Sequence, residues 1–145
     1  MINIAIYSRK EFIDYVNERQ LSDNTVKYID EYFISIIPTG GPKGIRIFEE
    51  DHINVITLVF DDVLRDELKD KHPDGEGFFT AKAFTMEQAI SLNKFIDSID
   101  ITKKINIHCV EGKSRSTSIA RYILETKTYM NSTVYNQLKE TNDNQ

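Results

Sequence analysis

The chain has 145 residues, of which 40% are hydrophobic and 28% are charged, and its formal net charge is −5. These values are typical of one globular domain over residues 1–145, and no apolar run approaches the roughly 20 residues of a membrane span. The acidic net charge disfavours general nucleic-acid binding, because that function needs a basic face to displace counterions.

The first half of the chain predicts three strands and a helix. Residues 2–7 form an apolar run that predicts a buried strand, and they lack the basic leader and long apolar segment of a signal peptide. Ser8 can cap an amphipathic helix that follows this strand. Residues 32–37 and 53–60 predict two further strands, and the first of them stops at the turn signal Pro-Thr-Gly-Gly-Pro of residues 38–42.

The second half predicts a loop, two helices and a fourth strand. Residues 65–80 are polar and contain proline and glycine, which predicts a long loop. Thr85 can open an amphipathic helix, and residues 105–108 predict a short strand. A helix is expected to follow over residues 116–129.

The C-terminal region predicts a break and a frayed end. Asn131 or Ser132 can cap a last, separate helix that continues through Leu138. Residues 140–145 are polar and predict a tail without fixed structure.

Strands that are apolar throughout, separated by amphipathic helices, indicate an α/β fold. We expect a central, mostly parallel sheet of about four to five strands with helices covering both faces. Ligands of such sheets bind beyond the carboxyl ends of the strands. The segment that follows residues 105–108 leaves a strand and opens a helix, so the sequence places a functional site there.

This segment, His-Cys-Val-Glu-Gly-Lys-Ser-Arg-Ser, runs from His108 to Ser116. A loop between a strand and a helix directs backbone N–H groups inward and adds the positive end of the helix dipole, which makes an anion site. Gly112 permits the turn, and the planar guanidinium of Arg115 can bind two phosphate oxygens at once. A thiol in that environment loses its proton easily, so Cys109 can attack phosphorus as a thiolate.

The other residues of the segment have supporting roles. Ser116 can donate a hydrogen bond to the sulfur and make it a better leaving group, and His108 is better placed to fix the loop than to act as a base. A lone cysteine after an apolar strand is usually a small buried hydrophobe, but the full set of residue types at these spacings favours catalysis. The predicted phosphate cradle consists of Val110, Glu111, Gly112, Lys113, Ser114 and Arg115.

The segment from His108 to Ser116 resembles the signature of the protein tyrosine phosphatase superfamily, and its Glu-Gly-x-Ser-Arg-Ser form resembles the dual-specificity branch. The resemblance extends over roughly residues 30–138. It is closest to small phosphatases of bacteria and their phages, in which a strand ends in Phe-Asp-Asp as residues 60–62 do here. It implies one phosphatase domain with the cysteine-phosphatase fold, in which Cys109 is the nucleophile, Arg115 binds phosphate and Ser116 assists hydrolysis of a phosphocysteine.

Phosphate ester cleavage also needs an acid that protonates the leaving oxygen, and the resemblance implies an aspartate upstream of the cysteine. Asp61 and Asp62 end a predicted parallel strand at the same sheet edge as Cys109, and at least one of them must serve another role. Asp74 is closer to the separation found in dual-specificity enzymes, but it lies, like Glu76, in an ordinary turn sequence. The sequence favours the Asp61/Asp62 pair, with a preference for Asp62.

The expected activity is hydrolysis of phosphotyrosine, and phosphoserine and phosphothreonine remain open as further substrates. The alternatives are the same chemistry on a small, non-protein phosphate ester and a phosphate-binding module without turnover. No cofactor or metal is predicted, because the histidines have no partners at ligand spacing. One cysteine and no export signal predict the reducing cytoplasm, and the oligomeric state stays open.

Overall fold

The computed structural model describes residues 2–40, 45–61 and 85–143, and it describes side chains through residue 128. The elements follow in the order β1 (Ile4–Tyr7), α1 (Arg9–Glu18), the 3-10 helix η1 (Val26–Tyr28), β2 (Glu31–Ile37), β3 (Val55–Val59), α3 (Met86–Asp97), β4 (Lys104–His108) and α4 (Ser114–Asp143). The predicted loop over residues 65–80 lies outside the described residues.

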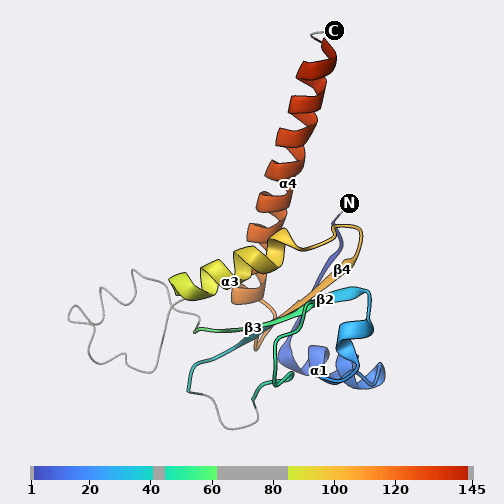
Figure 1. The fold of residues 1–145 in the computed structure, drawn as a ribbon. Helices are drawn as coiled ribbons and strands as arrows, with labels where there is room; N and C mark the ends of the chain where they lie inside the picture. Colours follow the sequence, from blue (N-terminus) through green and yellow to red (C-terminus); the bar gives the residue numbers. More distant parts are fainter. Residues whose placement is uncertain (1, 41–44, 62–84, 144–145) are drawn as a thin grey trace, which may run out of the picture.

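The four described strands form one sheet in the order β1-β4-β2-β3, and every strand pair is parallel (Figure 1). This confirms the predicted α/β fold with a central parallel sheet. β4 is the last of these strands in the chain, yet it lies between β1 and β2 in the sheet. The segment that follows β4 therefore leaves the sheet near the middle of its carboxyl edge.

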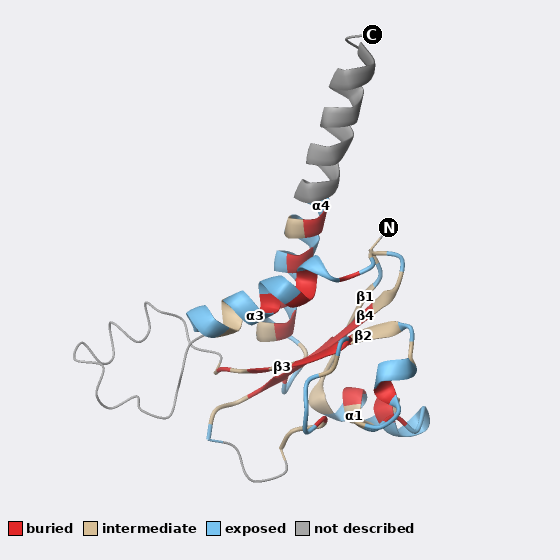
Figure 2. Cartoon of the chain, viewed as in Figure 1, coloured by how far each residue is buried: buried red, intermediate tan, exposed pale blue. Residues whose placement is uncertain are grey.

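Helices cover both faces of the sheet, with α3 and α4 on one face and α1 on the other (Figure 1). Because strand side chains alternate between the two faces, the strands contribute to two hydrophobic cores, and buried residues follow the strands (Figure 2). Ile105 and Ile107 of β4 pack with Cys109 in the core beneath α3 and α4. Phe33 of β2 packs with Phe12 of α1 in the other core.

Local hydrogen bonds define the starts of α1 and α3, as the sequence predicted. The Ser8 hydroxyl accepts a hydrogen bond from the backbone N–H of Glu11, and the Glu11 carboxylate accepts one from the backbone N–H of Ser8. This reciprocal pair satisfies two N–H groups that a helix start leaves unpaired. Thr85 caps α3 through its side chain, because its hydroxyl accepts from the backbone N–H of Gln88.

The two predictions for the C-terminal region are wrong. α4 is one continuous helix through Asp143, so it has no break at Asn131 or Ser132 and it includes most of the predicted tail at 140–145. Asparagine and serine each cost only about 0.5 kcal/mol in a helix interior, and the segment contains no glycine or proline that would stop the helix.

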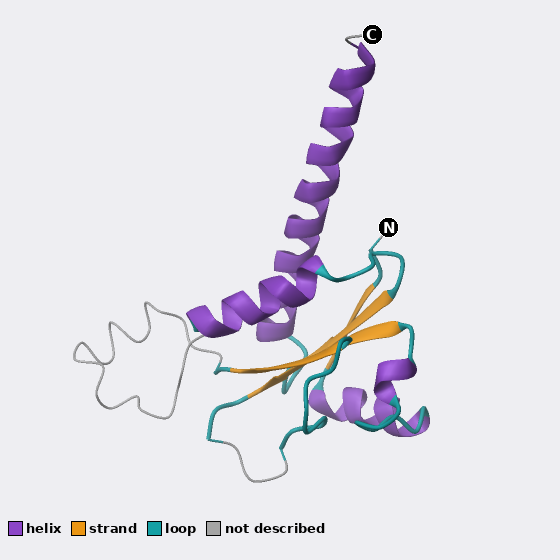
Figure 3. Cartoon of the chain, in the orientation of Figure 1, coloured by secondary structure: helices purple, strands orange, loops and turns teal. Residues whose placement is uncertain are grey.

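α4 extends well beyond the sheet (Figure 3). Among the described residues, no helix combines the length and apolar character that a membrane span requires.

Candidate functional site

The segment between β4 and α4 surrounds a cavity of about 300 Å³ at the carboxyl edge of the sheet. Its lining residues are Cys109, Val110, Glu111, Lys113, Ser114 and Arg115. We call residues 109–115 the cysteine loop. The predicted nucleophile and the predicted phosphate cradle thus lie around one cavity, and Gly112 contacts the sulfur from within the same loop.

The Cys109 sulfur is enclosed by hydrogen-bond donors. The backbone N–H of Gly112 donates to the sulfur at 3.2 Å, and the Ser116 hydroxyl oxygen lies 3.2 Å from it. Cys109 is only 2% exposed, and Ser116, in the first turn of α4, is fully buried. The sulfur therefore sits at the floor of the cavity beside the start of α4.

These donors change the acidity of the thiol. Burial of Cys109 would by itself raise the pKa of its thiol, since a thiolate is poorly solvated inside a protein. Hydrogen bonds from the Ser116 hydroxyl and from the backbone N–H groups of Ser116, Lys113 and Gly112 outweigh burial and hold the pKa of Cys109 below its ordinary value. Cys109 thus has an enlarged thiolate fraction, and the thiolate is the nucleophilic form.

Gly112 fixes the shape of the loop. Its φ of +72° lies in the left-handed region that favours glycine. A Cβ at this position would lie 2.7 Å from the backbone nitrogen of Ser8 and 2.8 Å from the carbonyl of Tyr7. The cysteine loop therefore packs directly on the junction between β1 and α1, and a side chain at residue 112 would separate them.

We expect Gly112→Ala to lower the free energy of unfolding by about 3 kcal/mol, of which about 1 comes from φ and the rest from the backbone clash. Gly40→Ala is the matched control, because Gly40 has a φ of +67° and nothing within 4 Å of an added Cβ. Urea denaturation of both variants measures the difference. Equal losses in the two variants would contradict the close packing of the loop on Ser8 and Tyr7.

Arg115 is held between the cysteine loop and the neighbouring end of β3. Its side chain is half-buried, and its Nη1 donates to the backbone carbonyl of Phe60 at 2.9 Å. This bond uses one of the roughly five N–H donors of a guanidinium, so it orients the planar group and leaves further donors for a ligand. Arg115, the residue predicted to bind phosphate, therefore lines the cavity with its guanidinium held in a fixed orientation.

His108 supports the loop through Ser35, a residue that the sequence analysis did not single out. Both residues are fully buried, and burial lowers the pKa of His108 to about 4, so its ring is neutral. Its Nδ1 lies 3.3 Å from the carbonyl oxygen of Cys109, which can only accept, so Nδ1 carries the proton. Nε2 then accepts from the Ser35 hydroxyl at 2.6 Å. The only feature of the sequence that could have indicated this role of Ser35 is its hydroxyl within an otherwise apolar strand.

The structure assigns one of the two candidate acids a structural contact. The Asp61 carboxylate accepts hydrogen bonds from the backbone N–H of Thr39, at 3.1 Å, and from the Thr39 hydroxyl. Asp61 therefore ties the end of β3 to the turn after β2. Asp62, Asp74 and Glu76 lie outside the described residues.

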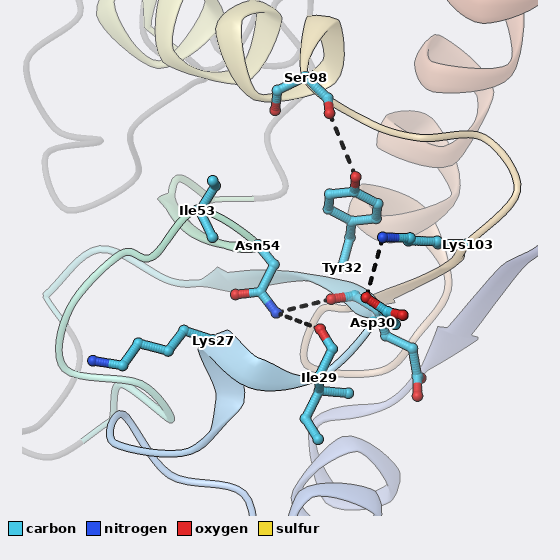
Figure 4. A pocket seen from close by; sticks show the side chains of 9 residues that line it. Lys27, Ile29, Asp30, Tyr32, Ile53, Asn54, Ser98 and Lys103 are labelled. Atoms are coloured by element: carbon cyan, nitrogen blue, oxygen red, sulfur yellow. Dashed lines mark hydrogen bonds and ion pairs between the residues drawn. The ribbon is translucent and has the colours of Figure 1, made fainter.

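A separate cavity of about 210 Å³ opens at the opposite, amino-terminal edge of the sheet (Figure 4). Its polar groups bond to one another: the Asn54 side-chain amide donates to the carbonyl of Ile29, and Lys103 pairs with Asp30 at 3.1 Å. The Asn54 contact holds the segment between η1 and β2 to the loop before β3, and the Lys103 contact holds it to the loop before β4. The described lining of the cavity contains no cysteine or histidine, and the hydroxyl of Ser98 donates to the carbonyl of Phe95 at 2.7 Å, so the cavity has no group comparable with the Cys109 thiol.

Within the described ranges, no three His, Cys, Asp or Glu side chains gather as metal ligands. Comparisons of the chain with models of known families, with curated proteins and with solved structures found no match. The geometry and the sequence of the cysteine loop are therefore the features from which a function can be inferred.

Proposed function

We propose that the chain is a cysteine-dependent phosphatase of the protein tyrosine phosphatase superfamily, with dual-specificity-like character. The observation that supports this most directly is the Cys109 sulfur, held by donors from Gly112 and Ser116 at the floor of a cavity that Arg115 also lines. A low-pKa thiol and a guanidinium that share one small cavity are suited to attack on a phosphate ester.

The proposed reaction has two steps. The Cys109 thiolate attacks phosphorus, the bond from phosphorus to the ester oxygen breaks, and an acid protonates the departing alcohol or phenol. Water then attacks the phosphocysteine and gives a proton to the conjugate base of that acid, the phosphorus–sulfur bond breaks, and inorganic phosphate and the thiolate are released. Backbone N–H groups of the cysteine loop and Arg115 stabilise the charge on the phosphoryl oxygens in both steps.

Ser116 has its largest role in the second step of this scheme. When the phosphorus–sulfur bond breaks, negative charge returns to the Cys109 sulfur. The Ser116 hydroxyl is 3.2 Å from that sulfur and fully buried, so it can stabilise the leaving thiolate without reorganisation. The same hydroxyl contributes to the low pKa of Cys109 in the resting protein.

We propose phosphotyrosine in proteins as the substrate class, with a small phosphate ester as the alternative. A reducing compartment such as the cytoplasm suits this chemistry, because oxidation of the thiolate would block it. The test is hydrolysis of nitrophenyl phosphate and of a phosphotyrosine peptide, with acid-quenched protein examined by mass spectrometry for phosphocysteine at residue 109. Tight phosphopeptide binding without hydrolysis or a trapped intermediate would support a phosphate-binding module instead.

We expect Asp62→Asn to lower turnover of a phosphotyrosine peptide by about 10²-fold and to change turnover of nitrophenyl phosphate little. The reason is that nitrophenolate is a good leaving group and needs no proton. Asp61→Asn is the matched control, since Asp61 already bonds Thr39. Asp61→Asn should lower the free energy of unfolding by about 1 kcal/mol and leave the ratio of turnover between the phosphotyrosine peptide and nitrophenyl phosphate unchanged. Intact phosphotyrosine turnover in Asp62→Asn would show that Asp62 is not the acid.

A further inference from the structure

A third cavity, of about 330 Å³, is lined in part by α1, the helix on the other face of the sheet from α3 and α4 (Figure 1). Two arginines line it: Arg9, in the first turn of α1, and Arg46, in the segment before β3. Ile13 and Ile47 contribute to an apolar wall. The combination of two guanidinium groups with an apolar wall distinguishes this cavity from the others in the described part of the chain.

One nitrogen of the Arg9 guanidinium lacks a hydrogen-bond partner among the described residues. Its Nη1 is shielded from solvent and has no hydrogen-bond partner, although the cost of such a buried donor is normally avoided. His108 does not compensate the charge of Arg9, because burial lowers the pKa of His108 and the positive charge of Arg9 acts in the same direction, which keeps the imidazole neutral. Arg9 as a whole is only partly buried, but this shielded N–H group without an acceptor among the described residues is suited to an anionic ligand.

The acid that lines the cavity does not neutralise the two arginines. The Asp23 carboxylate accepts from the backbone N–H groups of Glu49 and Glu50, at 3.0 and 3.2 Å, and lies 2.8 Å from Nε2 of His52. The Nε of Arg46 donates to the backbone carbonyl of Phe48 at 3.3 Å, and its Nη2 forms a long ion pair of 3.7 Å with an exposed carboxylate, that of Asp51. Such an exposed pair contributes little, so Arg46 can turn toward a ligand at small cost.

The cavity adjoins the cysteine loop through Arg9. The backbone N–H of Arg9 donates to the carbonyl of Val110 at 3.0 Å, and Val110 lines the cavity of Cys109. Ser8, the preceding residue, is the one that packs against Gly112. Arg9, which lines one cavity, is therefore bonded through its backbone to the loop that lines the other.

We propose that Arg9 and Arg46 form a second oxyanion site, which binds a carboxylate or a second phosphate on the same substrate whose phosphoryl group enters the cysteine loop. This inference rests on the proposed phosphatase function and extends it to a substrate class, acidic or doubly phosphorylated peptides. Arg9 supplies a shielded donor, its Nη1, and Arg46 supplies a second guanidinium to the same cavity.

The first test is kinetic and uses three phosphotyrosine peptides that differ at one flanking position, which carries glutamine, glutamate or phosphothreonine. A charge-assisted hydrogen bond is worth about tenfold in kcat/KM, so the wild type should prefer the anionic peptides over the glutamine peptide by about that factor. Comparison of the glutamate peptide with the phosphothreonine peptide shows whether the site prefers a carboxylate or a phosphate. No preference for either anionic peptide at any flanking position would overturn the proposal.

Substitutions of Arg9 and Arg46 test whether these two residues cause the preference for anionic peptides. Arg9→Gln and Arg46→Gln should each bring the ratio of kcat/KM between anionic and neutral peptides close to one. Arg9→Lys, which keeps the charge and loses the planar fork, should retain part of the preference. Lys10→Gln is the matched control, because it removes the same charge from the neighbouring, exposed position of α1. An equal loss of preference in Lys10→Gln would replace the site with a general charge effect and refute the proposal.

A binding measurement separates this inference from the proposed function. Titration of Cys109→Ser protein with inorganic phosphate is followed through the Nε–H NMR signals of Arg9 and Arg46, which the two glutamine variants assign. Saturable shifts of both signals are expected whether or not the wild type hydrolyses phosphate esters. Unmoved signals alongside normal hydrolysis would reject the second site and leave the phosphatase function in place.

Discussion

Cys109→Ser is expected to abolish phosphate ester hydrolysis, with a loss of about 10⁵-fold in kcat. A serine hydroxyl stays protonated at neutral pH in this cavity, whereas the donors around Cys109 lower the pKa of its thiol. Serine is close to cysteine in size, so the fold and the phosphate cradle should persist. Release of phosphate from nitrophenyl phosphate measures the loss.

A matched measurement tests whether the loss has the stated cause. Cys109→Ser should still bind a phosphotyrosine peptide, because Arg115 and the backbone donors remain. Cys109 is the only cysteine of the chain, so the rate of its alkylation by iodoacetamide against pH reports its pKa directly. Alkylation should stay fast below the pH at which an ordinary thiol reacts, and Ser116→Ala should move this profile to higher pH. Hydrolysis by Cys109→Ser within tenfold of the wild type would exclude a cysteine mechanism.

The sequence predicted the features that depend on neighbouring residues. Ser8 and Thr85 cap their helices through residues three positions later, which a local pattern can reveal. The cysteine loop is also local: a strand, a run of seven residues from Cys109 to Arg115 and a helix start define its course. For this reason the lining of the cavity at Cys109 could be predicted almost completely.

Features that depend on distant residues could not be predicted. The position of β4 between β1 and β2 follows from packing of the whole sheet, and no local pattern contains it. Ser35 and His108 are 73 positions apart in the sequence and meet only because β2 and β4 pair in register. The contact of Asp61 with Thr39 likewise needs the adjacent ends of β2 and β3.

The continuous helix α4 shows a different limit of prediction from the sequence. Asn131 and Ser132 are good caps, and a cap pattern predicts where a helix can start. It does not require the preceding helix to end, and only glycine or proline would have made continuation costly. The cap pattern and the continuous helix are therefore both consistent with the same residues, and the energy of continuation decides between them.

Arg115→Lys is expected to lower kcat/KM for a phosphotyrosine peptide by about 10³-fold, although it preserves the charge. Lysine lacks the planar fork that can bind two phosphoryl oxygens, and it cannot at the same time donate to the carbonyl of Phe60, which orients Arg115 at 2.9 Å. Arg121→Lys is the control, because Arg121 is exposed on the same helix. Its kcat/KM should match the wild type.

The stage at which Arg115→Lys fails identifies the role of the guanidinium. If Arg115 mainly stabilises charge in the transition state, kcat falls far more than KM rises, because the cavity still binds the ground-state phosphate through its backbone donors. A change confined to KM would make Arg115 a uniform binding group. Equal kcat/KM in Arg115→Lys and Arg121→Lys would remove Arg115 from the phosphate site, and with it the fixed geometry that the Phe60 carbonyl imposes on the cavity above Cys109.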